Sequence, residues 1–162
     1  GPWLGMPAAL PEGDGGYVIP YGDHPLDGEP VGEWVYTHIL NQARDYVHIM
    51  TPYLILDSEL EAALRFAARR GVEVTLILPH IPDKKVPFAL AKTHFLPLME
   101  AGVRIYEYTP GFLHAKVFVS DGLRGTVGTV NLDYRSLYHH FECGARRRCE
   151  NHIGKLHRGS CG

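Results

Sequence analysis

Hydrophobic residues along this chain form short apolar runs that alternate with segments of helical spacing. The runs are rich in β-branched residues and end near Pro, Gly or Asp, as strands do. They predict strands at 46–50, 72–78, 103–106, 117–119 and 124–129, and a short one at 17–19. The helical spacing predicts helices at 31–44, 58–70 and 87–101. The last of these should kink or split at Pro97, which has no backbone N–H to donate.

Strands that alternate with helices are typical of a layered α/β domain. We therefore predict an α/β sandwich with a mixed, largely parallel sheet flanked by helices. Its last two strands should form a hairpin, because Asp121-Gly122 is a strong turn signal. We divide the chain into a Gly- and Pro-rich lead-in or linker at 1–30, a catalytic half-domain at 31–144 and an atypical basic tail at 145–162.

Side chains that could catalyse a reaction or bind a ligand gather around the predicted hairpin. The alternation of a strand places His114 and Lys116 on one face, and the hairpin returns Thr129 and Asn131 beside them. Ammonium, hydroxyl and amide groups are the donors that a phosphoryl group needs for its oxygens. A neutral imidazole can attack phosphorus when a partner holds its other nitrogen, and we assign that orienting role to Glu142. A lone histidine is more often structural, but this grouping predicts a phosphoryl-transfer site.

The loops that follow the predicted parallel strands should border this site, because open α/β sheets carry ligands at the carboxyl ends of their strands. Tyr53, Lys84, Lys85 and Tyr108 lie in these loops. They are therefore candidate rim residues, although ordinary solvated loops account equally well for the two lysines.

The hairpin segment resembles the motif of the phospholipase D superfamily, in the spacing His114-x-Lys116-x4-Asp121-x6-Gly128-Thr129-x-Asn131. The flanking segments YEYTPGFLHAK and NLDYRSLYHHFECG, with TPYLILDSELEAAL and IPDKK upstream, are similar to the second catalytic half of bacterial cardiolipin synthases of this type. The likeness extends from about Gly16 to Gly144.

This resemblance implies a phosphatidyltransferase that forms cardiolipin from phosphatidylglycerol through a phosphohistidine. His114 would be the nucleophile or its acid/base counterpart. Lys116 and Asn131, helped by Thr129, would hold the phosphoryl oxygens, and Glu142 would orient His114. Asp121 belongs to the motif and would chiefly shape the hairpin and its charge network. The resemblance implies no metal and no other cofactor.

Members of the superfamily use two copies of the motif, in one chain or across a dimer, whereas this sequence contains one. The implied partner is a second motif, from the rest of a parent chain or from a homodimer with facing His114 side chains. We expect the isolated fragment to be weakly active or inactive as a monomer. Without the second acid/base group, a factor of ~100 to 10,000 in rate is missing.

Composition narrows the alternatives. The chain has 162 residues, 45% of them hydrophobic, which suits one core. Its net charge of −2 gives no overall attraction to nucleic acid, so we expect none as partner. The basic tail could touch anionic lipid, although a solvated tail is the simpler interpretation. Three cysteines crowded toward the end argue against a disulfide framework and match no usual zinc spacing.

No apolar run approaches the ~20 residues of a membrane span, and no signal peptide is visible. We expect the fragment to be soluble or peripheral, and the parent protein to lie at the cell membrane by resemblance. Two alternatives stay open. One is a phosphodiesterase or nuclease of the same superfamily, which the low basicity disfavours, and the other is a non-catalytic lipid-headgroup binding or dimerisation module.

Overall fold

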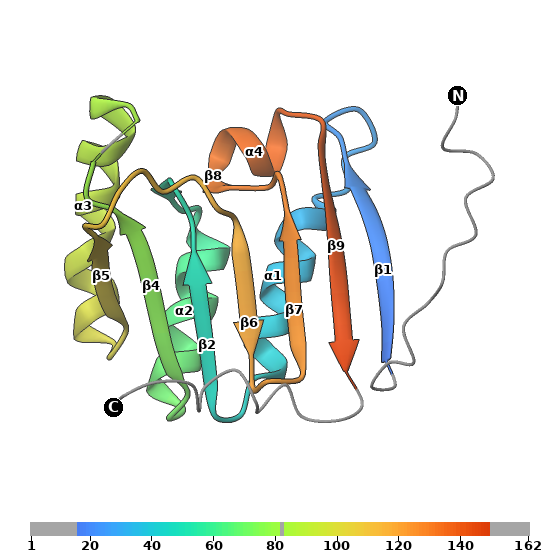
Figure 1. The fold of residues 1–162 in the computed structure, drawn as a ribbon, viewed down its shortest axis with the longest axis horizontal. Helices are drawn as coiled ribbons and strands as arrows, with labels where there is room; N and C mark the ends of the chain where they lie inside the picture. Colours follow the sequence, from blue (N-terminus) through green and yellow to red (C-terminus); the bar gives the residue numbers. More distant parts are fainter. Residues whose placement is uncertain (1–15, 82, 150–162) are drawn as a thin grey trace.

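The computed structural model describes residues 16–81 and 83–149. A seven-stranded sheet has the order β1-β9-β7-β6-β2-β4-β5 (Figure 1). Its strands are β1 (Gly16–Asp23), β2 (Tyr46–Met50), β4 (Glu73–Pro79), β5 (Arg104–Tyr108), β6 (Val117–Ser120), β7 (Arg124–Gly128) and β9 (Glu142–Cys149). The short strands β3 (Leu54–Ile55) and β8 (Leu132–Asp133) pair separately. The helices are α1 (Val31–Gln42), α2 (Ser58–Arg69), α3 (Lys85–Glu100) and α4 (Tyr134–Tyr138).

The sheet is mixed. Strands β2, β4 and β5 are parallel to one another. The pairs β2–β6, β6–β7, β7–β9 and β1–β9 are antiparallel. The prediction of an α/β fold with a mixed sheet flanked by helices is confirmed. Parallel pairing is less extensive than predicted, because the hairpin β6–β7 is extended by two further antiparallel strands instead of ending the sheet.

One face of the sheet carries the core. Helices α1 and α2 lie behind the sheet, α3 lies beside the β5 edge, and α4 lies at the edge where β2 and β7 end (Figure 1). Inward-facing side chains of the strands and the apolar stripes of α1 and α2 are almost fully buried, among them Ile39, Leu40, Val47, Ile49, Leu60, Leu64, Val74 and Leu76. Burial of one such side chain contributes roughly 1.5–3 kcal/mol, so this layer holds the helices on the sheet.

A buried tyrosine joins α1 to the hairpin. The Tyr36 ring stacks on Phe118 of β6, with ring centroids 4.0 Å apart and an angle of 5° between the planes. Its hydroxyl donates a hydrogen bond of 2.6 Å to the Val130 carbonyl, just after β7. Burial raises the pKa of this phenol well above its ordinary value, so it remains a donor at every physiological pH.

Helix α2 is capped by a side chain, and α3 contains an internal proline. Asp57 caps α2, because its carboxylate accepts a hydrogen bond from the Leu60 backbone N–H at 2.8 Å. Helix α3 continues through Pro97, so the predicted split is wrong. Pro97 lies near the C-terminal end of α3, where one backbone hydrogen bond is lost, and the buried Leu98 holds the following turn in the core.

Two predicted boundaries need correction. Gly16–Asp23, assigned to the lead-in, forms strand β1, and β9 runs to Cys149, into the predicted tail. Tyr21 accounts for the close fit of these strands, since a Cβ at Gly144 would lie 2.4 Å from the Tyr21 ring. The remaining residues of the predicted lead-in before Gly16 and of the tail after Cys149 lie outside the described part.

Within residues 16–81 and 83–149, no helix is long and apolar enough to cross a membrane.

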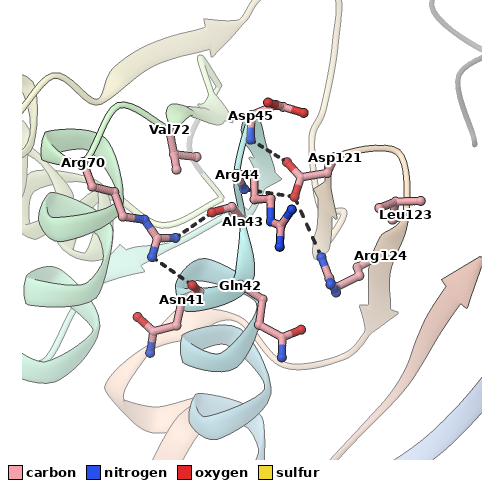
Figure 2. A pocket seen from close by; sticks show the side chains of 10 residues that line it. All are labelled: Asn41, Gln42, Ala43, Arg44, Asp45, Arg70, Val72, Asp121, Leu123 and Arg124. Atoms are coloured by element: carbon pink, nitrogen blue, oxygen red, sulfur yellow. Dashed lines mark hydrogen bonds and ion pairs between the residues drawn. The ribbon is translucent and has the colours of Figure 1, made fainter.

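Asp121 ties the β6–β7 turn to the start of β2 (Figure 2). Its carboxylate accepts hydrogen bonds of 3.0 Å from the backbone N–H groups of Arg44, Asp45 and Tyr46. Asp121 itself adopts a left-handed conformation, with φ of 55°. Burial alone would raise the pKa of this carboxyl, but the backbone hydrogen bonds outweigh burial and hold the pKa below its usual value.

We predict that Asp121→Asn lowers the free energy of unfolding at pH 7 by about 2 kcal/mol, because an amide nitrogen cannot replace a charged acceptor. A carboxyl whose pKa is depressed by folding stabilises the protein above its unfolded-state pKa, and this stabilisation is lost as the pH falls. The difference between the two proteins should therefore narrow below about pH 4. Urea denaturation at a series of pH values measures it. Asp45→Asn, at a neighbouring exposed carboxylate, is the control, and equal effects of both substitutions at pH 7 would contradict the prediction.

Candidate active site

Most of the predicted site residues lie at the end of the sheet where the strands β2, β4 and β7 terminate (Figure 1). A cavity of about 470 Å³ is lined by four of them, His114, Lys116, Thr129 and Asn131. His114 and Lys116 lie in the segment that leads into β6, and Thr129 and Asn131 follow β7. The antiparallel pairing of β6 with β7, with Val117 opposite Val127, brings the two segments together.

His114 is exposed and is held by aromatic rings. Its imidazole stacks on Phe112, with centroids 5.7 Å apart and 14° between the planes. The Tyr53 ring approaches it edge-on, with centroids 6.2 Å apart. Among the described residues the imidazole nitrogens have no hydrogen-bond partner, so both are open to a ligand. The predicted orienting contact from Glu142 is therefore not made in this structure.

Lys116 supplies the cation of the cavity. Its Nζ donates a hydrogen bond of 2.8 Å to the His114 carbonyl, which fixes the ammonium beside the imidazole. Burial lowers the pKa of Lys116, while the carboxylates of Glu142 and Asp133 act in the opposite sense. Glu142 is therefore electrostatically coupled to the site through Lys116.

Glu142 is nearly buried, with 8% of its side chain exposed, and its two oxygens have separate partners. The Thr129 hydroxyl donates a short hydrogen bond to one oxygen. His140 Nδ1 lies 3.5 Å from the other. The Thr129 backbone N–H in turn donates to the Cys143 carbonyl at 2.8 Å, and the Cys143 N–H donates to the Thr129 hydroxyl at 3.0 Å. Thr129 therefore connects β7, β9 and Glu142.

Asn131 is anchored by its amide. The Nδ2 group donates a hydrogen bond of 2.8 Å to the Ser136 hydroxyl, whereas Oδ1 is buried without a hydrogen-bond partner in the described part of the chain. A half-turn of the amide exchanges these roles, because a serine hydroxyl can donate as well as accept. The Ser136 hydroxyl would then donate to Oδ1, and Nδ2 would be available to a ligand.

A second, narrower cavity of about 160 Å³ adjoins the first and shares Asn131 with it. Tyr53 and Lys84, two of the predicted rim residues, line it together with Tyr134, Arg135 and His140. Sequence reasoning missed Tyr134 and Arg135, because the helix that carries them, α4, is only one turn long and was not predicted. Tyr108 lines neither cavity, and the side chain of Lys85 lies outside the described part.

Asp121 is not part of this cluster. Asp121 follows β6, whereas His114 precedes β6. The two residues therefore lie at opposite ends of this strand, on the order of 20 Å apart. The carboxylate of the sequence motif is thus placed to hold the hairpin, and not to touch a ligand of the His114 cavity.

We predict that Thr129→Ala lowers the free energy of unfolding at pH 7 by about 1–3 kcal/mol, because the nearly buried Glu142 carboxylate loses its hydroxyl donor. Thr129→Ser keeps that hydroxyl and should retain most of the stability. Chemical denaturation of the three proteins measures the difference. Equal losses in both variants would show that the hydroxyl contributes nothing.

Sequence comparison identifies relatives. The family described as "Cardiolipin synthase, PLD-like domain" matches residues 36–157. A cardiolipin synthase of Geobacillus kaustophilus is 37% identical over 159 residues, which cover 95% of this chain and 30% of that protein. An uncharacterized protein of Streptococcus mutans is 73% identical over 128 residues, 79% of this chain and 28% of that protein. The chain thus spans less than a third of the length of these relatives.

The fold has solved counterparts. The crystal structure of Nuc from Salmonella typhimurium, a phospholipase D family member, matches with a TM-score of 0.68 and 15% identity. The match covers 86% of this chain and 87% of that one. At this identity the likeness concerns the fold alone. Together with the matched family region, it confirms the resemblance seen in the hairpin segment: the chain belongs to the family of PLD-like domains of cardiolipin synthases.

Proposed function

We propose that this chain is one catalytic half of a phosphatidyltransferase that makes cardiolipin from phosphatidylglycerol. The observation that carries the proposal is the shared cavity of His114, Lys116, Thr129 and Asn131, which joins an open imidazole to donors for phosphoryl oxygens. Membership of the cardiolipin synthase family supports the choice of a phospholipid as substrate.

The proposed reaction has two displacements at phosphorus. A ring nitrogen of His114 attacks the phosphorus of phosphatidylglycerol, the bond from phosphorus to the headgroup oxygen breaks, and glycerol leaves with a proton from a second acid/base group. The headgroup hydroxyl of another phosphatidylglycerol then attacks the phosphohistidine. The phosphorus–nitrogen bond breaks, and the hydroxyl proton returns to the second group. Two molecules of phosphatidylglycerol give one of cardiolipin and one of glycerol.

The surrounding groups stabilise the charge on the phosphoryl oxygens. Lys116 faces the cavity with its ammonium beside His114 and offers a charge-assisted hydrogen bond. Asn131 donates from Nδ2 after a half-turn of its amide, which leaves Oδ1 to accept the hydrogen bond from the Ser136 hydroxyl. Thr129 contributes its position, because its hydroxyl is already committed to Glu142.

In this proposal Glu142 acts on the site indirectly. Its carboxylate favours the charged form of Lys116 and holds Thr129 in place. The open nitrogens of His114 mean that its orienting partner comes with the substrate or with the second half of the site.

That second half is the proposed partner. An imidazole that attacks phosphorus cannot also protonate the oxygen that leaves from the opposite side, so a second acid/base group is required. It would come from another PLD-like motif, either in the rest of a longer chain or in a two-fold related copy. Because the substrate is a lipid, we place the reaction at a membrane surface.

We predict that His114→Asn reduces cardiolipin formation by at least about 1,000-fold, because the nucleophile is removed. The assay incubates the chain with phosphatidylglycerol vesicles, separates the lipids and measures glycerol release. Acid-labile phosphate on the protein after a rapid quench would report the phosphohistidine.

His80→Asn is the matched control, since His80 is an exposed histidine paired with Glu107 outside both cavities. It should keep full activity. Phosphatidic acid as sole product would replace the transferase by a hydrolase, and lipid binding without turnover would indicate a non-catalytic module. Activity that survives His114→Asn would refute the proposed nucleophile.

We also predict that the specific activity of the isolated chain rises with protein concentration, because only a pair of chains supplies both histidines. Loss of the second acid/base group costs a factor of ~100 to 10,000, so a monomer should be almost inactive. Size-exclusion chromatography with mass detection, run alongside the assay, relates activity to oligomeric state. Undiminished turnover in a strict monomer would contradict the requirement for two motifs.

A further inference from the structure

A larger cavity, of about 890 Å³, lies at the opposite end of the strands from the His114 cluster. It is bordered by the end of α1, the start of β2 and the β6–β7 turn (Figure 2). Its polar lining residues are Asn41, Gln42, Arg44, Asp45, Arg70, Asp121 and Arg124. No step of the proposed phosphatidyl transfer uses these side chains.

Some of the lining charges are already satisfied. The Arg70 guanidinium donates to the carbonyls at the end of α1, at 2.8 Å to Asn41 and 2.8 Å to Ala43. The Asp121 carboxylate accepts three backbone N–H groups, as described above. Asp45 is exposed and keeps its carboxylate in water. Neither Arg70 nor Asp121 therefore needs a further partner.

Two arginines keep donors for a further ligand, namely Arg124, whose guanidinium is paired only with Asp121, and the exposed Arg44. Only 15% of the Arg124 side chain is exposed, and its closest carboxylate oxygen, on Asp121, is 3.8 Å from Nη1. Its Nε is buried and has no hydrogen-bond partner within the described ranges. The Arg44 guanidinium makes no ion pair or hydrogen bond with any described residue. In Figure 2 the side chains of Arg44 and Arg124 both extend toward Gln42. A buried guanidinium donor left unpaired costs free energy, which a ligand would recover.

The neighbouring strand adds positive charge. Arg148 lies opposite Arg124 in the β7–β9 pairing, and Arg146 lies two residues along on the same face. Burial lowers the pKa of His38 in α1, and the charges of Arg146 and Arg124 lower it further. Positive charge from β9 therefore reaches α1, whose C-terminal end borders the cavity.

We infer that this cavity is an anion site for a phosphate group, held by Arg44 and Arg124, separate from the catalytic cavity. The planar fork of a guanidinium matches the oxygens of a phosphate in a bidentate manner. The phosphate could belong to a lipid headgroup or to a free phosphate ion, and both present the same oxygens to the two arginines. The anion site and the His114 cavity lie at opposite ends of the strands. A ligand in one of them therefore does not block the other.

The test follows the Arg124 Nε–H resonance by NMR in the full chain, with 15N-labelled arginine, while inorganic phosphate is added at constant ionic strength. We expect a saturable shift. Arg44→Gln should weaken the apparent affinity by about tenfold or more, the loss expected for one charge-assisted hydrogen bond. Arg44 is exposed, so its substitution leaves the fold intact, and Arg44→Lys should be intermediate because it keeps the charge without the fork.

Two matched controls separate this site from other anion binding. Arg69→Gln, next to Arg70 but outside the cavity, should leave the titration unchanged, and so should Lys116→Gln in the catalytic cavity. Vesicles of phosphatidylglycerol, compared with phosphatidylcholine, identify the source: displacement of phosphate by the former alone indicates a lipid headgroup, and no displacement indicates the free ion. A shift that stays linear with phosphate, or that is unaffected by Arg44→Gln, would overturn the inference.

Discussion

The arrangement of the site depends on one carboxylate that never touches it. By accepting the three N–H groups at the start of β2, Asp121 fixes where β6 ends, and with it the pairing of Ile49 with Phe118. A shift of one residue in this pairing would turn His114 and Lys116 to the other side of the sheet. Asp121, the acidic residue of the motif, therefore fixes the register in which β6 pairs with β2. This explains why Asp121, at the opposite end of β6, belongs to the same sequence motif as His114.

Much of the fold could be predicted because its central strands and helices carry strong local signals. The strand Tyr46–Met50 was predicted to the residue, and α2 was predicted at 58–70 and is observed at Ser58–Arg69. Of the two outer antiparallel strands, β1 was predicted only at 17–19 and β9 was not predicted, for a physical reason. β1 contains a proline and β9 a run of arginines, and neither alternates as a half-buried strand does. Their strand conformation comes from pairing with each other and with β7, which no local pattern records.

The site was predictable where residues lie near one another in sequence, and less so where tertiary structure brings them together. His114, Lys116, Thr129 and Asn131 share a cavity as expected from the hairpin. The bond between Glu142 and Thr129, by contrast, depends on how β9 begins beside β7. The motif spacing alone cannot show which of several nearby polar groups a carboxylate selects, so the roles of these residues in catalysis stay predictions.

The buried Tyr36 hydroxyl links the catalytic edge to the helical layer. It donates a hydrogen bond to the carbonyl of Val130, the residue before Asn131, while the Tyr36 ring stacks on Phe118 in the sheet. Any tilt of α1 would accordingly shift Asn131, which lines the His114 cavity. Repacking of α1 could in this way change the geometry of the candidate site without substitution of any residue that lines its cavity.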